Sequence, residues 1–390
     1  MKDIVIIAGK RTPMGEYGGA LKDLSALELG AIAGRAAIEQ SGVAPEAFDH
    51  VVFGNALQTS GDAIYGARHV GLKAGLPIET PALTVNRLCG SGIQAIVSGA
   101  QMIELDEADY VLAGGMESLS QAPHVLRGAR WGFRLGEGQL EDSLMVALLD
   151  TYCGCYMAGT SENLSRMHDI SREAQDEFAL RSQNAAVAAW EAGKFSEEIT
   201  PVEIKTRKGV KTFDKDDHMR PDATMEGLAK LRPAFSKDGF VTAGNASGIV
   251  DGGAAVVLTT ADKANGKALG RIVSWGIAGV QPETMGIGPV PATRIALEKA
   301  GLTVSDIDLV EVNEAFAGQY LAVEKVLELD RDKVNVNGGA IALGHPLGAT
   351  GTRLTMTLLY ELRRRRQRYG LATACIGGGQ GIAIIIEALG

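Results

Sequence analysis

The sequence predicts an α/β fold made of two similar halves with a long insertion between them. Three observations support this prediction. Apolar strand-like runs alternate with helix-like segments in both halves, glycine-rich turns follow the strand ends, and one stretch of the chain is repeated later. Alternating strands and helices are typical of a parallel sheet, and near-continuous apolar strands suit a sheet covered on both faces. We therefore expect a largely parallel sheet with helices on both faces.

The internal repeat joins residues 37–56 to residues 296–315 without a gap. Both segments indicate a helix, a glycine stop, a turn and a buried strand. Any two strand–helix–strand units resemble each other to some extent, but ungapped identities favour a true duplication. The identical pairs are Ala37 and Ala296, Glu39 and Glu298, Gly42 and Gly301, Asp49 and Asp308, Val51 and Val310, and Ala56 and Ala315.

Downstream of the repeat, each half continues in the same order. A strand ending in Val-Asn is followed by a glycine-rich turn, a helix and another strand. The predicted elements are, in the first half, a strand at 84–86, the Cys89 turn, a helix from about Gly92 and a strand at 110–113, and, in the second half, a strand at 335–337, the His345 turn, a helix from about Ala349 and a strand at 371–374.

The segment between the halves has a different character. It contains a predicted long helix from Ser171 to about Ala192, with Gly193 as its stop. We expect this insertion to fold over the sheet ends, where α/β sheets bind their ligands. The predicted domains are an N-terminal half of residues 1–117 plus about 248–268, an inserted loop domain of residues 118–247 and a C-terminal half of residues 269–390.

The composition is that of an ordinary globular protein. Apolar residues make up 46%, charged residues 22%, and the net charge is −9. This acidic balance argues against nucleic acid as a partner, because nucleic-acid-binding proteins usually have a basic face. Four cysteines do not suggest a disulfide scaffold. The first residues predict a strand instead of a signal peptide, and no apolar run has membrane-spanning length. We expect a cytoplasmic protein without a membrane partner; a mitochondrial-matrix location is also compatible.

Cys89 is the first candidate for chemistry. It stands before Gly90-Ser91-Gly92 and a predicted helix with apolar residues at helical spacing. A thiol at a helix N-terminus has a lowered pKa, and the free N–H groups there can hold an oxyanion. A buried, inert cysteine is the alternative. The presence of His345 and Cys375 favours a nucleophile.

His345 and Asn313 are candidates for assisting this nucleophile. His345 lies between two glycines, and Pro346 suits the first position of the next helix. A neutral imidazole there could accept the proton of Cys89. Asn313 follows a predicted strand at 308–312, where an amide can hold a water or orient an imidazole. A surface-loop histidine and an Asx-turn are the alternatives.

Cys375 ends a predicted buried strand and opens a turn with three consecutive glycines. Its thiol is a candidate second acid or base, and the backbone N–H of Gly377 is a candidate oxyanion donor. The alternative is a small residue at a crowded strand end. Cys153 and Cys155 have no histidine or cysteine partner at zinc-finger spacing, so we expect structural thiols and no metal site.

Taken together, these residues resemble the thiolase family. The match runs the full length of the chain and the central and C-terminal parts are most similar to the 3-ketoacyl-CoA thiolases of fatty-acid oxidation, while acetoacetyl-CoA thiolases share the catalytic blocks. The resemblance implies a thiolase-like fold, with two duplicated βαβαβαββ halves in a layered α-β-α-β-α arrangement and an inserted loop domain. It rests on five blocks, at residues 86–92, 244–248, 313–317, 337–346 and 375–381.

The resemblance also implies roles for the candidate residues. Cys89 attacks the acyl carbonyl and becomes the acyl-enzyme. His345 activates Cys89 and, with a water held by Asn313, forms one oxyanion hole, while the N–H groups of Cys89 and Gly377 form the other. Cys375 exchanges a proton with the second substrate, which is the CoA thiol in cleavage and the α-carbon of acetyl-CoA in condensation. No metal or redox cofactor is implied, and coenzyme A is a substrate.

Coenzyme A contacts follow from the same resemblance. Many short-chain members have His-Met where this chain has Tyr156-Met157, which argues against strict acetoacetyl-CoA specificity. Thiolases are usually dimers or tetramers, so we expect a homodimer or homotetramer with acyl-CoA and CoA as ligands. The implied CoA-binding positions are Met157, Arg220, Ser247, Met285, Ala315 and Phe316.

The predicted activity is that of a 3-ketoacyl-CoA thiolase or an acetyl-CoA C-acetyltransferase. Three alternatives use some of the same residues. A decarboxylating ketoacyl synthase has one catalytic cysteine with His-His or His-Asn, whereas this chain has a second candidate in Cys375. A catalytically silent acyl-CoA-binding protein would have lost Cys89, His345 or Cys375. A Cys-His hydrolase would need no second-substrate site.

Overall fold

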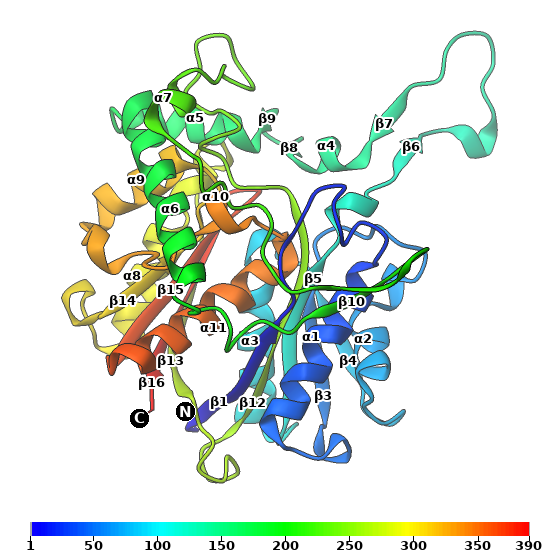
Figure 1. Ribbon diagram of the computed structural model, residues 1–390, viewed down its shortest axis with the longest axis vertical. Helices are drawn as coiled ribbons and strands as arrows, with labels where there is room; N and C mark the ends of the chain where they lie inside the picture. The colour runs from blue at the N-terminus through cyan, green and yellow to red at the C-terminus, as the bar shows by residue number, and fades with distance from the viewer. Residues whose placement is uncertain (1, 390) are drawn as a thin grey trace.

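The computed structural model describes residues 2–389 and shows two α/β halves joined side by side (Figure 1). The N-terminal half contains β1 (Ile4–Arg11), β2 (Gly15–Glu16), α1 (Ala26–Ser41), β3 (His50–Gly54), α2 (Gly66–Ala74), β4 (Ala82–Val85), α3 (Ser91–Glu104), β5 (Val111–Glu117) and, after the insertion, β12 (Val250–Thr260). The C-terminal half contains β13 (Gly270–Gly279), α8 (Pro289–Ala300), β14 (Leu309–Val312), α9 (Ala317–Leu327), α10 (Ala340–Leu343), α11 (Leu347–Arg365), β15 (Tyr369–Ile376) and β16 (Gln380–Ala388).

The insertion has short strands and two long helices. It contains β6 (His124–Leu126), β7 (Leu140–Asp142), α4 (Ser143–Ala147), β8 (Leu149–Asp150), β9 (Cys155–Tyr156), α5 (Met157–Met167), α6 (Arg172–Glu191), β10 (Val202–Thr206), β11 (Gly209–Phe213) and α7 (Met225–Ala229). The predicted long helix is α6. The side chain of Ser171 accepts a hydrogen bond from the backbone N–H of Ala174 at its start, and Gly193 has a φ of +68° just beyond its end.

The sheet is mixed, so the expectation of a largely parallel sheet was wrong. The strand order is β14-β15-β16-β13-β1-β12-β5-β3-β4. β3 runs parallel to β4 and β5, and β14 runs parallel to β15. β12 is antiparallel to β1 and β5, and β16 is antiparallel to β13 and β15. The reason for β16 is local: Gly378 and Gly379 have φ near +80° and make a tight turn, which returns the chain beside β15.

The two halves repeat one topology, as the aligned segments predicted. In the N-terminal half, β4 is an additional edge strand. The remaining order from that edge inward, β3-β5-β12-β1, corresponds to β14-β15-β16-β13 in the C-terminal half. Gly42 ends α1 with a φ of 64° and Gly301 ends α8 with a φ of 67°, both left-handed helix caps. The predicted strand at 335–337 is absent. Asn335 has a φ of +46°, and only an isolated bridge joins the preceding Val334 to Val310.

Side-chain alternation divides the molecule into five layers. Along β1, Ile4 and Ile6 point into a core shared with α3 and α11, whereas Val5 and Ile7 point into a core with α1 and α2. Along β16, alternate residues enter the same central core or an outer core with α8 and α9. The helices α3 and α11 therefore lie between the two sheet halves (Figure 1). This confirms the predicted α-β-α-β-α arrangement.

Two glycines let α3 and α11 cross closely. A Cβ atom at Gly92 would lie 2.4 Å from the backbone nitrogen of Thr352, and one at Gly351 would lie 2.4 Å from the backbone nitrogen of Ile93. A larger residue at either position would push the helices apart. Because both glycines lie near the N-termini of their helices, the crossing brings the preceding turns, which carry Cys89 and His345, to the same region.

A buried ion-pair network attaches the insertion to the sheet. Arg11, which is 0% exposed, donates two hydrogen bonds to Asp216 at 2.7 and 2.9 Å and one to Glu198 at 2.6 Å. The β6–β7 segment, in contrast, extends away from the body of the molecule (Figure 1). Within residues 2–389, none of the helices combines the length and the apolar character that crossing a bilayer requires.

Candidate active site

Cys89 lies in a short 3₁₀ turn, Leu88–Gly90, directly before α3. Leu88 has a φ of +45°, a left-handed conformation that costs a non-glycine residue about 1 kcal/mol or more. The backbone N–H groups of Gly377 and of Cys89 itself lie near the thiol and favour its ionised form. The surrounding structure thus fixes a strained turn so that the thiol meets two N–H donors.

The pKa of Cys89 differs from the expected one. Burial raises the pKa of its thiol to about 11, although the N–H groups of Gly377 and Cys89 act in the opposite direction. The expectation that the helix N-terminus lowers this pKa was wrong, because desolvation of the thiolate outweighs the N–H groups. The resting nucleophile is therefore a neutral thiol that must lose its proton during the reaction.

His345 is buried, with 6% of its surface exposed, and is not a surface-loop histidine. Its Nδ1 lies 2.6 Å from Oγ1 of Thr350, and that hydroxyl donates to the backbone oxygen of Pro346 at 3.1 Å. Since the hydroxyl proton is used, we infer that Nδ1 carries a proton and donates to Thr350. Nε2 is then the unprotonated nitrogen, the atom that a general base uses. Pro346 is the residue before α11, not its first residue as expected.

The charge state of His345 follows from its surroundings. Burial lowers the pKa of the imidazole to about 3, and the positive charge of Arg353 adds to this effect. His345 is therefore neutral over the physiological pH range. A neutral histidine within reach of a neutral thiol can accept its proton when the thiol attacks.

Asn313 follows β14 and contacts His345 directly. Its Nδ2 lies 3.3 Å from Nε2 of His345, and its backbone N–H donates to the oxygen of Thr373. The side chain is fully buried, and its Oδ1 has no hydrogen-bond partner in the described part of the chain. A buried polar atom without a partner leaves room in the hydrogen-bonding scheme for a water. The contact with His345 favours the interpretation that Asn313 orients an imidazole over the Asx-turn alternative.

Cys375 lies near the end of β15 and is fully buried. Burial raises the pKa of its thiol, and the proximity of Cys89 raises it further. Met285 and Ala315 pack with it, and Met157 and Phe316 border this cluster. Four of the six predicted CoA-binding residues therefore surround the second cysteine.

The two remaining predicted CoA contacts are placed differently. Ser247 adjoins the cluster, because its backbone N–H donates to the oxygen of Ala315 at 3.0 Å. Arg220 is held elsewhere: its backbone N–H donates to Gln183 at 2.8 Å, and its guanidinium pairs with Glu16. The structure therefore shows Ser247 at the site and Arg220 engaged with a carboxylate.

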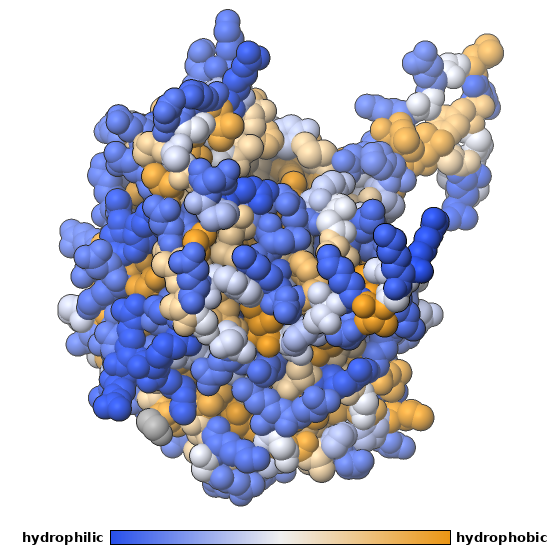
Figure 2. All heavy atoms as spheres, in the orientation of Figure 1, coloured by the Kyte–Doolittle hydropathy of each residue, from blue (hydrophilic) through white to orange (hydrophobic). Residues whose placement is uncertain are grey.

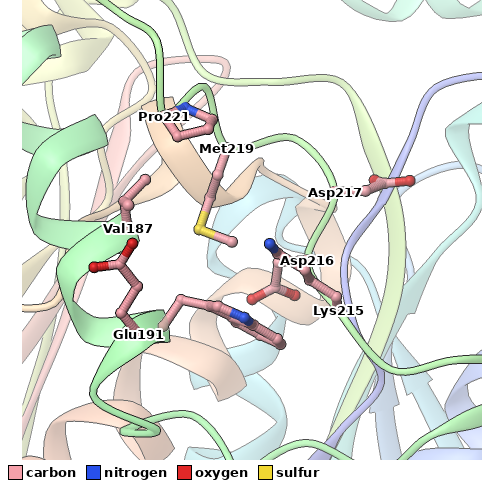
Figure 3. A pocket seen from close by; sticks show the side chains of 8 residues that line it. Val187, Glu191, Lys215, Asp216, Asp217, Met219 and Pro221 are labelled. Atoms are coloured by element: carbon pink, nitrogen blue, oxygen red, sulfur yellow. The ribbon is translucent and has the colours of Figure 1, made fainter.

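A hollow of about 400 Å³ is lined by Met219 and Pro221, the chain neighbours of Arg220 (Figure 3). The ammonium of Lys215 lies 5.4 Å from the centre of the Trp190 ring. Three carboxylates line the hollow against a single lysine, so it is poorly suited to the phosphates of CoA. None of the five candidate catalytic residues borders it, which are Cys89, Asn313, His345, Cys375 and Gly377. Its lining residues are Val187, Trp190, Glu191, Lys215, Asp216, Asp217, Met219 and Pro221.

Two residues at the site were not predicted from the sequence. Thr350, in the first turn of α11, orients His345, and its position just after a candidate base was the available signal. Glu117 ends β5 and is fully buried; an acidic residue at the end of an apolar strand was the signal there. Cys153 and Cys155 are part-exposed free thiols at the turn between β8 and β9.

Comparisons with known proteins identify the family. The model of the thiolase N-terminal domain matches residues 4–262, and the model of the thiolase C-terminal domain matches residues 266–388. The chain belongs to the thiolase family. Thiolases are acyltransferases. In this thiolase Asn313 contacts His345, and Cys375 lies near Cys89.

Individual relatives agree with this assignment. This thiolase is 56% identical to the mitochondrial 3-ketoacyl-CoA thiolase of Homo sapiens over 391 residues, with 99% of this chain and 98% of the relative covered. It is 52% identical to the beta-ketothiolase BktB of Cupriavidus necator over 390 residues, with 99% of each covered. Both names denote cleavage or condensation of ketoacyl thioesters, which confirms the predicted enzyme class.

Solved structures give the same result. A crystal structure of the human mitochondrial 3-ketoacyl-CoA thiolase in complex with CoA has a TM-score of 0.97 and 54% identity, covering 100% of this thiolase and 98% of that chain. The acetyl-CoA acetyltransferase of Bacillus anthracis has a TM-score of 0.98 and 48% identity, covering 100% and 99%. The predicted fold family is therefore confirmed.

Proposed function

We propose that this thiolase cleaves 3-ketoacyl-CoA with CoA to give acyl-CoA and acetyl-CoA, and catalyses the reverse Claisen condensation. The observation that carries the proposal is the meeting of Cys89, the N–H of Gly377 and Cys375, beside the His345–Asn313 pair. A nucleophile, a base, oxyanion donors and a second thiol are the groups that two-step acyl transfer needs. The relatives' names support the same reaction.

In cleavage, Sγ of Cys89 forms a bond to the ketone carbon while Nε2 of His345 takes the thiol proton. The negative charge on the substrate oxygen is stabilised by hydrogen-bond donors, for which the N–H groups of Cys89 and Gly377 and a water held by Asn313 are the candidates. The carbon–carbon bond then breaks. Cys375 gives its proton to the departing α-carbon of acetyl-CoA, which leaves an acyl group on Cys89.

The second step returns the enzyme to its starting state. The thiolate of Cys375 takes the proton of the incoming CoA thiol, and the CoA sulfur attacks the acyl carbonyl. The bond to Cys89 breaks, and its sulfur recovers the proton held by His345. The products are acyl-CoA and two neutral cysteines. Each step uses groups of this chain and CoA as a substrate, so we propose no separate cofactor.

The apolar residues around Cys375 favour a range of acyl chain lengths. Met157, Met285 and Phe316 provide an apolar border around Cys375, and methionine adapts to acyl groups of different shape. Tyr156, which stands where short-chain relatives have histidine, is 40% exposed and lies 6.3 Å from Phe235, ring centre to ring centre. We propose 3-ketoacyl-CoA substrates broader than acetoacetyl-CoA.

The test is kcat/KM for thiolysis of acetoacetyl-CoA, 3-ketohexanoyl-CoA and 3-ketohexadecanoyl-CoA by the purified protein. We expect measurable thiolysis of all three, with values within about 100-fold of one another. A steep preference for acetoacetyl-CoA would overturn the proposed chain-length range. Absence of thiolysis with every substrate would overturn the proposed function itself.

Arg220 is the proposed contact for a phosphate of CoA. In the ligand-free structure its guanidinium pairs with Glu16, and both side chains are more than 40% exposed. An exposed ion pair contributes little stability and exchanges partners readily. We propose that a CoA phosphate replaces Glu16 as the partner of Arg220. Arg220→Ala should then raise the Kd for CoA and leave the Kd for pantetheine, which lacks the phosphates, unchanged.

We propose a homodimer or homotetramer. The β6–β7 arm exposes apolar side chains, visible as orange spheres on the projecting segment (Figure 2); Trp131 is 88% exposed and Leu135 106% exposed. β4 lies at the edge of the sheet and exposes Leu83, which is 42% exposed. Large exposed apolar residues and an open strand edge are typical of surfaces covered by another copy. Light scattering coupled to gel filtration measures the assembly.

The cellular location stays a proposal. The charge, the cysteine content and the reaction suit a reducing compartment that contains CoA thioesters, and we propose the cytoplasm. Several relatives are named as mitochondrial, and the matrix satisfies the same conditions. Cell fractionation of the native protein decides between the two.

A further inference from the structure

A buried carboxylate connects the two halves of the thiolase beside the site. Glu117, the last residue of β5, is 0% exposed. Its Oε1 accepts hydrogen bonds from Nδ2 of Asn55 at 2.8 Å and from the backbone N–H of Leu57 at 3.0 Å. Its Oε2 accepts from the backbone N–H groups of Ala56 at 3.0 Å and Gly348 at 2.8 Å. Both oxygens are therefore saturated by donors from two different parts of the chain.

One of these donors leads to His345. Gly348 lies in the first turn of α11, three residues after the histidine, and the N–H groups of a first helical turn have no partner inside the helix. A carboxylate at this end also suits the helix dipole. The packing is tight, because a Cβ atom at Gly348 would lie 2.5 Å from the backbone oxygen of Met116. Glu117 thus holds the start of α11 against the end of β5.

The other donors lead to Cys89. The backbone oxygen of Ala56 accepts a hydrogen bond from Nδ2 of Asn86 at 3.1 Å. Oδ1 of Asn86 accepts from the backbone N–H of Leu88 at 2.9 Å, and Leu88 is the strained residue directly before Cys89. A continuous hydrogen-bond path therefore runs from Glu117 through the 55–57 loop to the nucleophile's turn.

Keeping a carboxylate in this place is costly for the fold. Burial raises the pKa of Glu117 to about 7, although the N–H groups of Leu57, Ala56 and Gly348 favour the charged form; the carboxylate of Asp251 on β12 raises the pKa further. Replacing a buried charge with packed apolar groups is often neutral or stabilising. A role in positioning the two turns gives a reason for a carboxylate here despite the free-energy penalty of its burial.

We propose that Glu117 is a positioning residue, whose carboxylate sets the separation between the Cys89 turn and the His345 turn. The proposal rests on the proposed roles of Cys89 and His345 as nucleophile and base. It does not require Glu117 to touch the substrate.

The test is Glu117→Gln in the full chain. The amide keeps the size but turns one acceptor into a donor that faces N–H groups. We expect kcat for thiolysis to fall about 10- to 100-fold, the effect of one or two lost buried hydrogen bonds, while KM for CoA changes less than about threefold. We also expect wild-type kcat to fall below about pH 7, where the carboxylate becomes protonated, and the variant to show no such decline.

The matched control is Glu361→Gln at the other end of α11. Glu361 is 2% exposed and also accepts several hydrogen bonds, but it lies roughly 20 Å along the helix from His345. We expect kcat of this control to be unchanged. Unchanged kcat in Glu117→Gln, or equal losses in both variants, would overturn the proposal.

Two further measurements keep the result interpretable. If Glu117→Gln does not fold, Glu117→Asp, which keeps the charge on a shorter side chain, must show a kcat loss with little change in KM; wild-type kcat there overturns the proposal. Acyl-enzyme formation by the wild-type protein is measured in parallel. Its absence would contradict the proposed function, whereas its presence together with a fully active Glu117→Gln would contradict only the positioning role.

Discussion

The backbone N–H of Gly377 lies near the thiol of Cys89, so the C-terminal half completes the surroundings of a nucleophile carried by the N-terminal half. The same donor is suited to an oxyanion once Cys89 has attacked a carbonyl. Neither half alone contains the site, because His345, Asn313 and Cys375 all come from the second half. The duplication therefore produced two similar frameworks that contribute different groups.

The pKa of Cys89 predicts how its reactivity depends on pH. With a thiol pKa of about 11 and a His345 pKa of about 3, both groups are neutral at pH 7, and only about one thiol in ten thousand is ionised. We expect the rate of Cys89 alkylation by iodoacetamide, followed by peptide mass spectrometry, to rise about tenfold per pH unit from pH 7 to 10. A plateau from pH 5 to 9 would indicate a preformed thiolate–imidazolium pair and contradict this account.

Thr350 predicts a second effect on catalysis. In Thr350→Val the Nδ1–H of His345 loses its acceptor, which frees the imidazole to turn and change tautomer. We expect kcat for thiolysis to fall about 10- to 100-fold, with KM little changed.

The control for this variant is Thr355→Val on the same helix. Thr355 is also buried, and its hydroxyl donates to the backbone oxygen of Gly351 at 2.9 Å, as the Thr350 hydroxyl does to Pro346. Within residues 2–389 its side chain makes no hydrogen bond to His345. Equal kcat values for Thr350→Val and Thr355→Val would show that the Thr350–His345 contact has no catalytic value.

Much of the fold followed from sequence patterns with a direct structural meaning. The aligned glycines Gly42 and Gly301 predicted matching helix ends, and both adopt the left-handed conformation. Strand direction was less predictable. Apolar periodicity indicates a buried strand but not which neighbour it pairs with, so the antiparallel returns of β12 and β16 were missed.

The candidate catalytic residues were predictable because each stands in a distinctive turn. The pKa values of these residues were not predictable from the sequence. A helix N-terminus suggested a low pKa for Cys89, but desolvation of the thiol, which determines the opposite result, depends on packing between the halves. Glu117 contacts residues from distant segments of the chain, which the linear sequence does not bring together. Thr350 lies in the first turn of α11, whose start was predicted at the wrong residue. The sequence therefore offered only weak signals for both contacts.

Glu361 predicts a pH-dependent contribution to stability. Burial favours its neutral form, but Asn337, Arg365, Lys194 and Arg364 together lower the pKa from 4.5 to about 2. The drop corresponds to about 3 kcal/mol, and screening of the partly exposed arginines reduces it to about 2 kcal/mol. Because the folded pKa is depressed, this stability is present above pH 4.5 and is lost as the pH falls toward 2.

We therefore expect Glu361→Gln to lower the free energy of unfolding by about 2 kcal/mol at pH 7. The difference from wild type should shrink progressively below pH 4.5. Urea denaturation at several pH values measures it. A difference that is constant from pH 7 to pH 3 would show that packing, and not charge, accounts for the loss.

The projecting arm predicts a change of assembly. Removing the apolar side chains at its tip, with Trp131→Ser and Leu135→Ser together, should lower the molar mass measured by light scattering without changing the thermal unfolding of the body, because these residues are almost fully exposed in the single chain. A mass identical to wild type would exclude the arm as an assembly contact.

The acyl-enzyme is the most direct test of the central claim. Purified protein is mixed with acetyl-CoA, quenched in acid and digested, and the peptides are analysed by mass spectrometry, with Cys89→Ala as the control. The account predicts one acetyl group on the peptide containing Cys89, its removal by added free CoA, and no label in the variant. An unlabelled protein, or a label on Cys375 in place of Cys89, would contradict it.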